Sequence, residues 1–140
     1  MLTTRSCAQI FDLAGGKVND IPMDATAYAH RDALYYLQSY AISDNLFEGV
    51  SRTTKDFLAG VSNLITNDMK ADGEFTDFGA YPGYVDLDLG ADAQKLYWRS
   101  NLPRLEQVKA KYDPGQVFRN PQSVKPAGVK ESRPSRDAKL

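Results

Sequence analysis

Apolar and polar side chains alternate along residues 33–42, where an extended chain would align Leu34, Tyr36, Gln38, Tyr40 and Ile42 on one face. This period of two, together with three tyrosines in the same stretch, predicts a β-strand. Both faces of the predicted strand are fairly apolar, which indicates a central strand between two layers.

A second strand is predicted near the start of the chain, because residues 7–13 are mostly apolar and run into Gly15-Gly16. A short piece through Val18 and Ile21 follows the glycines, so we expect a hairpin-like start. A phosphate-binding loop is disfavoured here, because the stretch has neither a Gly-x-Gly-x-x-Gly pattern nor a Gly-Lys-Ser/Thr ending.

Helical spacing predicts a long amphipathic helix over residues 51–69, with Thr53 and Asp56 as a variant capping box. Its apolar stripe consists of Phe57, Leu58, Val61, Leu64, Ile65 and Met69. A short helix is predicted after Asp92, and Asn101 is a suitable cap for a further helix that ends at residues 113–115.

The stretch Tyr81-Pro82-Gly83-Tyr84-Val85-Asp86 is the best candidate for chemistry, with two phenols and a carboxylate in a strand predicted over residues 78–86. Strict alternation would send Tyr81 and Tyr84 to opposite faces, so both reach one site only if Pro82-Gly83 bends the strand. The alternative is that both rings pack in a core and both hydroxyls form structural hydrogen bonds.

The composition predicts one soluble, globular domain, since the chain has 140 residues of which 42% are hydrophobic. Nucleic-acid binding is disfavoured, because 17 basic and 18 acidic residues are mixed along the chain. A membrane span is not expected, because no apolar run approaches roughly 18 residues, and the first residues do not resemble a secretory signal.

The chain has one cysteine, Cys7, and one histidine, His30. These numbers exclude an internal disulfide and leave too few soft ligands for a transition-metal site, so no metal is expected. Cys7 is interpreted as a small buried hydrophobe. His30, followed by Arg31 and Asp32, is interpreted as a structural hydrogen-bonding residue more readily than as a catalyst.

Several motifs occur in an order that resembles a known family. The motifs are Gly15-Gly16 and the stretches at residues 25–32, 81–86, 97–105, 109–114 and 117–123. Together they resemble the C-terminal, berberine-bridge-enzyme-like (BBE-like) part of the FAD-linked oxidoreductases related to vanillyl-alcohol oxidase, and more closely its fungal oligosaccharide-oxidase-like branch. The resemblance extends over about residues 11–126.

We expect an α+β fold in which an antiparallel sheet is covered on one face by helices. The sheet would contain strands at residues 7–13, 33–42 and 78–86, and the helices would cover residues 51–69 and 91–112. The resemblance implies that this unit, residues 7–126, is the C-terminal part of a larger flavoprotein substrate domain. An exposed strand edge and a large apolar patch are therefore expected, and residues 127–140 are expected to form a disordered basic tail.

The resemblance also implies chemistry. The family oxidises a carbohydrate or another alcohol with FAD, and Tyr84 matches the phenol proposed there as the base while hydride leaves for flavin N5. A phenol serves as such a base only if its pKa is lowered or if proton loss is concerted with hydride transfer. By the same resemblance Tyr81 would line the pocket, and Gly83 stands where the family pattern has Asn. Asp20 lies near the position of an acidic base in the plant branch of the family. The alternative for Asp20 is a solvated aspartate in a turn.

The family's FAD-binding domain is N-terminal, so we expect FAD to be bound mainly outside this chain, by a complementary FAD domain, and the chain alone to be inactive. The alternative is a non-catalytic, truncated remnant or a binding module. His30, Arg31, Asn101 and Gln122 match family positions that are expected to be structural.

Full-length family members are commonly secreted. The ending Ala138-Lys139-Leu140 nevertheless resembles the Ser-Lys-Leu peroxisomal address, and an uninformative tail is the alternative.

Overall fold

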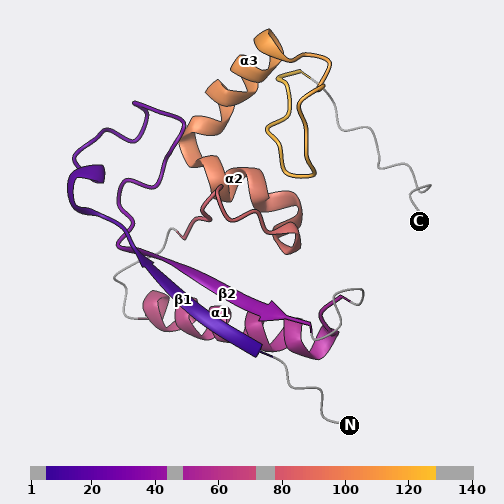
Figure 1. Ribbon diagram of the computed structural model, residues 1–140. Helices are drawn as coiled ribbons and strands as arrows, with labels where there is room; N and C mark the ends of the chain where they lie inside the picture. Colours follow the sequence, from indigo (N-terminus) through magenta and orange to yellow (C-terminus); the bar gives the residue numbers. More distant parts are fainter. Residues whose placement is uncertain (1–5, 44–48, 72–77, 129–140) are drawn as a thin grey trace.

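The computed structural model describes residues 6–43, 49–71 and 78–128 (Figure 1). The predicted tail from residue 129 onward and its terminal address lie outside these residues. Within these residues, two strands and three α-helices are the main elements, and the α+β class is confirmed. They are β1 (Ser6–Leu13), β2 (Tyr35–Ile42), α1 (Arg52–Ala71), α2 (Ala93–Trp98) and α3 (Leu102–Tyr112), with 3-10 turns η1 (Gly16–Val18), η2 (Leu87–Asp92) and η3 (Arg99–Asn101).

The two strands pair antiparallel, from Ser6 opposite Ile42 to Leu13 opposite Tyr35, which confirms both predicted strands. The side chains of alternate residues therefore lie on opposite faces. One face packs against α1, where Ser39 Oγ lies 3.1 Å from Ser62 Oγ and Tyr35 Oη donates to Met69 Sδ at 3.5 Å. Figure 1 shows α1 running along the sheet, as the expected single helical cover requires.

The opposite face of the sheet carries Asp12 and Tyr36, which are paired across the two strands. Farther along this face Ile10 is 42% exposed, and Tyr40 and Ile42 are each 48% exposed. Among the described residues the sheet has two strands, so β2 has one neighbour and is not the central strand that its pattern indicated. Cys7, expected to be buried, is exposed near the open end of β1.

The predicted hairpin at Val18 and Ile21 is wrong. Gly15 and Gly16 have φ angles of 104° and 61°, which glycine adopts without steric cost, and they lead into the 3-10 turn η1. Asn19 N donates to Gly16 O at 3.0 Å. The chain then continues through turns to residue 34, so the partner of β1 is the later strand β2.

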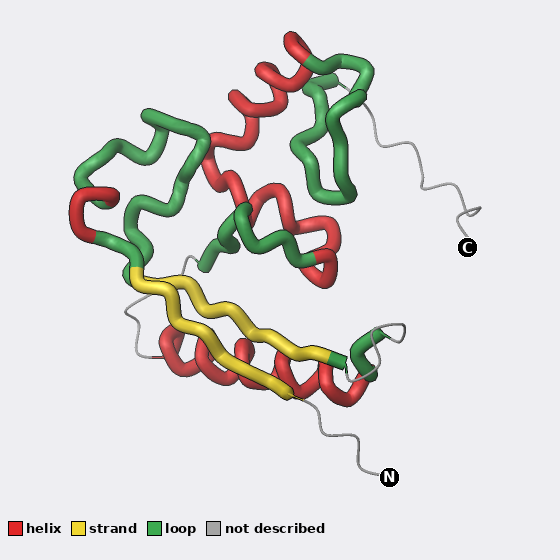
Figure 2. The backbone as a smooth tube through the Cα atoms, in the orientation of Figure 1, coloured by secondary structure: helices red, strands yellow, loops and turns green. Residues whose placement is uncertain are grey.

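The third predicted strand, over residues 78–86, is also wrong. Tyr84 N donates to Tyr81 O at 3.0 Å, so these residues form a β-turn with Pro82 and Gly83 at its centre. Proline fixes a φ that suits the second position of a turn and donates no ladder hydrogen bond. Figure 2 shows the strands in yellow and the segment that leads into η2 and α2 as a green loop.

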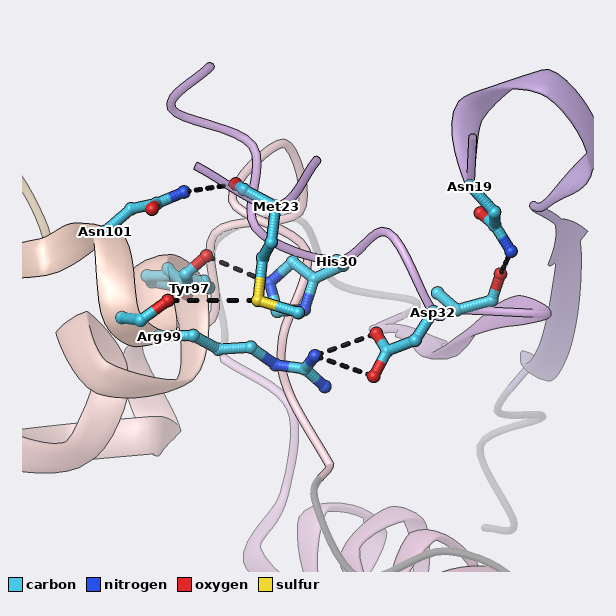
Figure 3. Close-up of polar contacts among 9 residues, drawn as sticks. Asn19, Met23, His30, Asp32, Tyr97, Arg99 and Asn101 are labelled. Carbon is cyan, nitrogen blue, oxygen red and sulfur yellow. Dashed lines mark hydrogen bonds and ion pairs between the residues drawn. The ribbon is translucent and has the colours of Figure 1, made fainter. Parts of the chain in front are cut away.

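The predicted helices are confirmed, but both of their predicted caps are wrong. Ser51, rather than Thr53, caps α1, because Ser51 Oγ accepts from Thr54 N at 3.3 Å. Asn101 occupies the N-cap position of α3 without a capping side-chain bond. Its buried Nδ2 donates instead to Met23 O at 2.8 Å and Thr26 O at 3.1 Å, so it fastens the 14–34 segment to the helices (Figure 3).

Replacement of Asn101 by alanine should lower the free energy of unfolding by about 1–3 kcal/mol, because the carbonyls of Met23 and Thr26 lose their buried donor. Chemical denaturation measures the change. Asn63→Ala, on an exposed position of α1, is the control and should change stability by less than about 0.5 kcal/mol. Equal losses in the two variants would contradict the role of Asn101.

Candidate active site

Four tyrosines, Tyr28, Tyr36, Tyr81 and Tyr84, form a contiguous cluster, called here the tyrosine cluster. Tyr81 lies at its centre, with ring centroids 4.8 Å from Tyr36, 5.1 Å from Tyr84 and 6.4 Å from Tyr28. The rings of Tyr81 and Tyr84 are nearly perpendicular, at 83°, which is a favourable aromatic geometry. The Pro82-Gly83 turn therefore brings both predicted tyrosines to one place.

Asp12 completes the site. Tyr84 Oη donates to Asp12 Oδ2 at 2.9 Å, which connects the turn to β1. The sequence interpretation did not include Asp12. The signal for it was weak, namely one charged side chain within the mostly apolar stretch of residues 7–13.

The hydrogen bond to Asp12 raises the pKa of the Tyr84 phenol above its ordinary value of 10, and the negative charge of the carboxylate adds to this effect. Both interactions favour the protonated phenol. Tyr84 is therefore a neutral phenol at physiological pH, and its proton lies in the hydrogen bond to Asp12.

The other two tyrosines are more enclosed. Burial raises the pKa of the Tyr28 phenol, and the Arg31 guanidinium lies 4.7 Å from the centre of the Tyr28 ring. The hydroxyl of Tyr36 is buried and forms no hydrogen bond within the described part of the chain. A buried, unsatisfied hydroxyl has donor and acceptor capacity for a bound molecule.

The turn that carries Tyr81 and Tyr84 is held against α2 on both sides. Ala80 N donates to Leu96 O at 3.0 Å, and Asp86 N donates to Tyr97 Oη at 2.9 Å. Tyr97 is only 2% exposed, and its hydroxyl in turn donates to Gln122 Oε1. These bonds fix the position of the tyrosine cluster.

His30 is a further part of this support. Its Nε2 donates to the backbone carbonyl of Tyr97 at 2.9 Å (Figure 3). The imidazole fills the space beside Gly79, where a Cβ would lie 2.2 Å from His30 Cε1. Arg99 adds a second connection to the same segment through Asp32, at 2.8 Å. His30 is therefore a packing residue of the support.

Asp20 does not lie in the tyrosine cluster. It forms an exposed ion pair with Lys17 at 2.8 Å, which agrees with the alternative of a solvated aspartate in a turn.

Arg31 and Gln122 were expected to be structural, and both form hydrogen bonds to other segments. Arg31 donates to Val18 O and Thr26 Oγ1. Gln122 accepts from the Tyr97 hydroxyl and donates to Asp86 O.

Within the described ranges, no three His, Cys, Asp or Glu side chains gather as metal ligands. No helix in the same ranges has the length and hydropathy to cross a membrane.

Comparison with known proteins gives consistent matches. The family described as berberine and berberine-like matches residues 80–125. An FAD-linked oxidoreductase of Metarhizium anisopliae is 40% identical over 119 residues, which are 82% of this chain and 21% of that protein. The chitooligosaccharide oxidase of Gibberella zeae is 38% identical over 122 residues, 82% of this chain and 23% of that protein.

Solved structures agree. A carbohydrate oxidase from Microdochium nivale, in complex with a substrate analogue, superposes with a TM-score of 0.73 at 34% identity, covering 92% of this chain and 27% of that one. The fold and these similarities show that the chain is homologous to FAD-linked oxidoreductases over most of its own length. Residues 80–125 form a domain of the berberine and berberine-like family, and the chain spans about a quarter of the length of these relatives.

The buried imidazole predicts a pH dependence of stability. Burial lowers the pKa of His30, so the folded protein favours the neutral ring. This contribution to stability is fully present above the unfolded pKa of about 6.5, and it is lost as pH falls towards the lower folded pKa.

We therefore expect the wild type to lose stability relative to His30→Gln as pH falls from 7.5 to 5.0. The glutamine is a neutral side chain with an amide donor, so it does not titrate in this range. Denaturant unfolding at each pH measures the difference, and His30 is the only histidine in the chain. Parallel pH curves for the two proteins would rule out a buried neutral imidazole.

Proposed function

We propose that this chain is the substrate-side segment of an FAD-dependent oxidase acting on a carbohydrate or another alcohol. In this proposal Tyr84 accepts the proton of the substrate hydroxyl. The observation that carries the proposal is the hydrogen bond from Tyr84 Oη to Asp12 Oδ2.

The raised pKa of Tyr84 supports a concerted transfer rather than a phenolate formed in advance. As the substrate hydroxyl gives its proton to Tyr84 Oη, the phenol proton moves to Asp12 Oδ2. The proton that leaves the substrate oxygen is thus balanced by protonation of Asp12, whose carboxylate becomes a neutral carboxylic acid. A phenol base needs either a lowered pKa or proton loss concerted with hydride transfer, and the hydrogen bond to Asp12 favours the concerted route.

The flavin, when bound, supplies the acceptor for the hydride that leaves the substrate carbon. The residues of the site fit beside such a group, because Tyr84 is 41% exposed and the buried hydroxyl of Tyr36 has no hydrogen-bond partner among the described residues. Tyr36, Tyr81 and Tyr84 would border the alcohol, and Asp12 would receive its proton.

FAD binding itself is assigned to a complementary domain that covers the open face of the sheet. Two observations support this assignment: the chain spans about a quarter of its relatives, and Ile10, Tyr40 and Ile42 are partly exposed on that face. The carbohydrate is favoured as substrate by relatives that are named chitooligosaccharide, glucooligosaccharide and xylooligosaccharide oxidases.

The test of activity pairs this chain with a complementary FAD domain and records flavin absorbance and peroxide production with oligosaccharides. Tyr84→Phe should lower kcat by about 10²- to 10⁴-fold, because general base catalysis is lost. Asp12→Asn should also lower kcat, while Tyr112→Phe, at a 74% exposed position of α3, should not.

The alternative is a non-catalytic binding module. An assembled, flavin-loaded pair without peroxide production would reject the oxidase and support this alternative.

A second prediction concerns the Tyr84 phenol without any flavin. Asp12→Asn removes both the charge and the carboxylate acceptor that raise the pKa of Tyr84, so this pKa should fall towards 10. Ring-labelled tyrosine followed by NMR through alkaline pH measures it. Asp68→Asn, on α1, should leave the Tyr84 pKa unchanged, and an unchanged value in Asp12→Asn would contradict the proposed pair.

A further inference from the structure

Two β-turns of this protein have the same sequence at their centre and the same hydrogen bond. In one, Tyr84 N donates to Tyr81 O at 3.0 Å across Pro82-Gly83. In the other, Gln116 N donates to Asp113 O at 3.1 Å across Pro114-Gly115. Neither glycine has a φ in the left-handed region, so neither turn requires glycine for its backbone conformation.

The two glycines differ in what surrounds them. A Cβ at Gly115 would meet no atom within 4 Å. A Cβ at Gly83 would lie 2.5 Å from Cε1 and 2.8 Å from Cζ of the Tyr81 ring, which is far inside van der Waals contact. The Tyr81 ring, in the position that it has in this chain, and not the backbone, therefore leaves room only for glycine at residue 83.

The ring in this position has a definite place in the site. It lies over Gly83 with its centroid 4.8 Å from Tyr36, and 5.1 Å from Tyr84, whose hydroxyl donates to Asp12. A side chain at residue 83 would occupy the same space. The ring would then leave its contacts with Tyr36 and Tyr84, because a packed site yields by moving the nearest side chain.

We propose that Gly83 is a positioning residue: its lack of a side chain seats the Tyr81 ring as the wall of the substrate site beside the Tyr84 phenol. This inference rests on the proposed function. The Tyr81 ring is then an aromatic surface for the alcohol substrate, and Gly83 acts only through it.

The experiment compares Gly83→Ala with Gly115→Ala in the full chain, each also combined with Tyr81→Ala. Each single change lowers the conformational entropy of the unfolded chain by the same amount. The difference in stability between the two variants therefore reports the contact of residue 83 with the Tyr81 ring. We expect the folding equilibrium constant of Gly83→Ala to fall about tenfold relative to Gly115→Ala. In the Tyr81→Ala background this difference should disappear.

NMR contacts between the labelled rings of Tyr81 and Tyr84 are the second measurement. They should be lost in Gly83→Ala and kept in Gly115→Ala. The inference would be overturned if Gly83→Ala and Gly115→Ala were equally stable and both kept the contact between the rings of Tyr81 and Tyr84. If Gly83→Ala does not fold, the Tyr81→Ala background decides: a folded double variant supports the contact, and an unfolded one overturns it.

In the assembled enzyme, Gly83→Ala should raise KM severalfold while kcat changes by less than about twofold, because a wall contacts substrate and transition state alike. An unchanged KM would overturn the positioning role. A wild-type pair without turnover would reject the oxidase proposal alone, since the stability and NMR comparisons involve no flavin.

Discussion

The buried side chain of Tyr97 joins segments that are far apart in the sequence, and the site depends on this junction. Its backbone carbonyl accepts from His30, its hydroxyl accepts from Asp86 N, and the same hydroxyl donates to Gln122. With Ala29 and Ala93 it forms the buried apolar centre of the described chain. A hydroxyl that is both donor and acceptor is fully used here, so exchange for phenylalanine would leave buried polar groups without partners.

The site lies where this helical part meets the sheet. Tyr84 and Tyr81 come from the turn fastened to α2, whereas Asp12 and Tyr36 come from paired strands. The ladder register fixes the second pair and the bonds to Leu96 and Tyr97 fix the first. The distance between phenol and carboxylate is therefore set by tertiary structure, and no single element could establish it.

Periodicity predicted the two strands and the helices, because each pattern reflects burial against a neighbouring layer. It failed at residues 78–86, where Pro82-Gly83 forms a turn despite the apolar and aromatic neighbours. Asp12 could not be predicted as the partner of Tyr84, since 72 residues separate them and only the fold brings them together. Asparagine is a common helix cap, but the Asn101 amide binds the carbonyls of Met23 and Thr26 instead. These residues are distant in the sequence, so a local pattern could not predict the contact.

The raised pKa of Tyr84 argues against a phenolate that forms before the reaction and acts as a base alone. A tyrosine that acted alone would need its pKa lowered by a cation, whereas this one donates to an anion and becomes a poorer acid. In the proposed mechanism the same anion accepts the phenol proton, so that the pair acts on an alcohol together. The proposed functional unit is then the hydrogen bond between the turn and the sheet. The buried contacts of Tyr97, which hold the turn in place, would serve this chemistry as well as the stability of the fold.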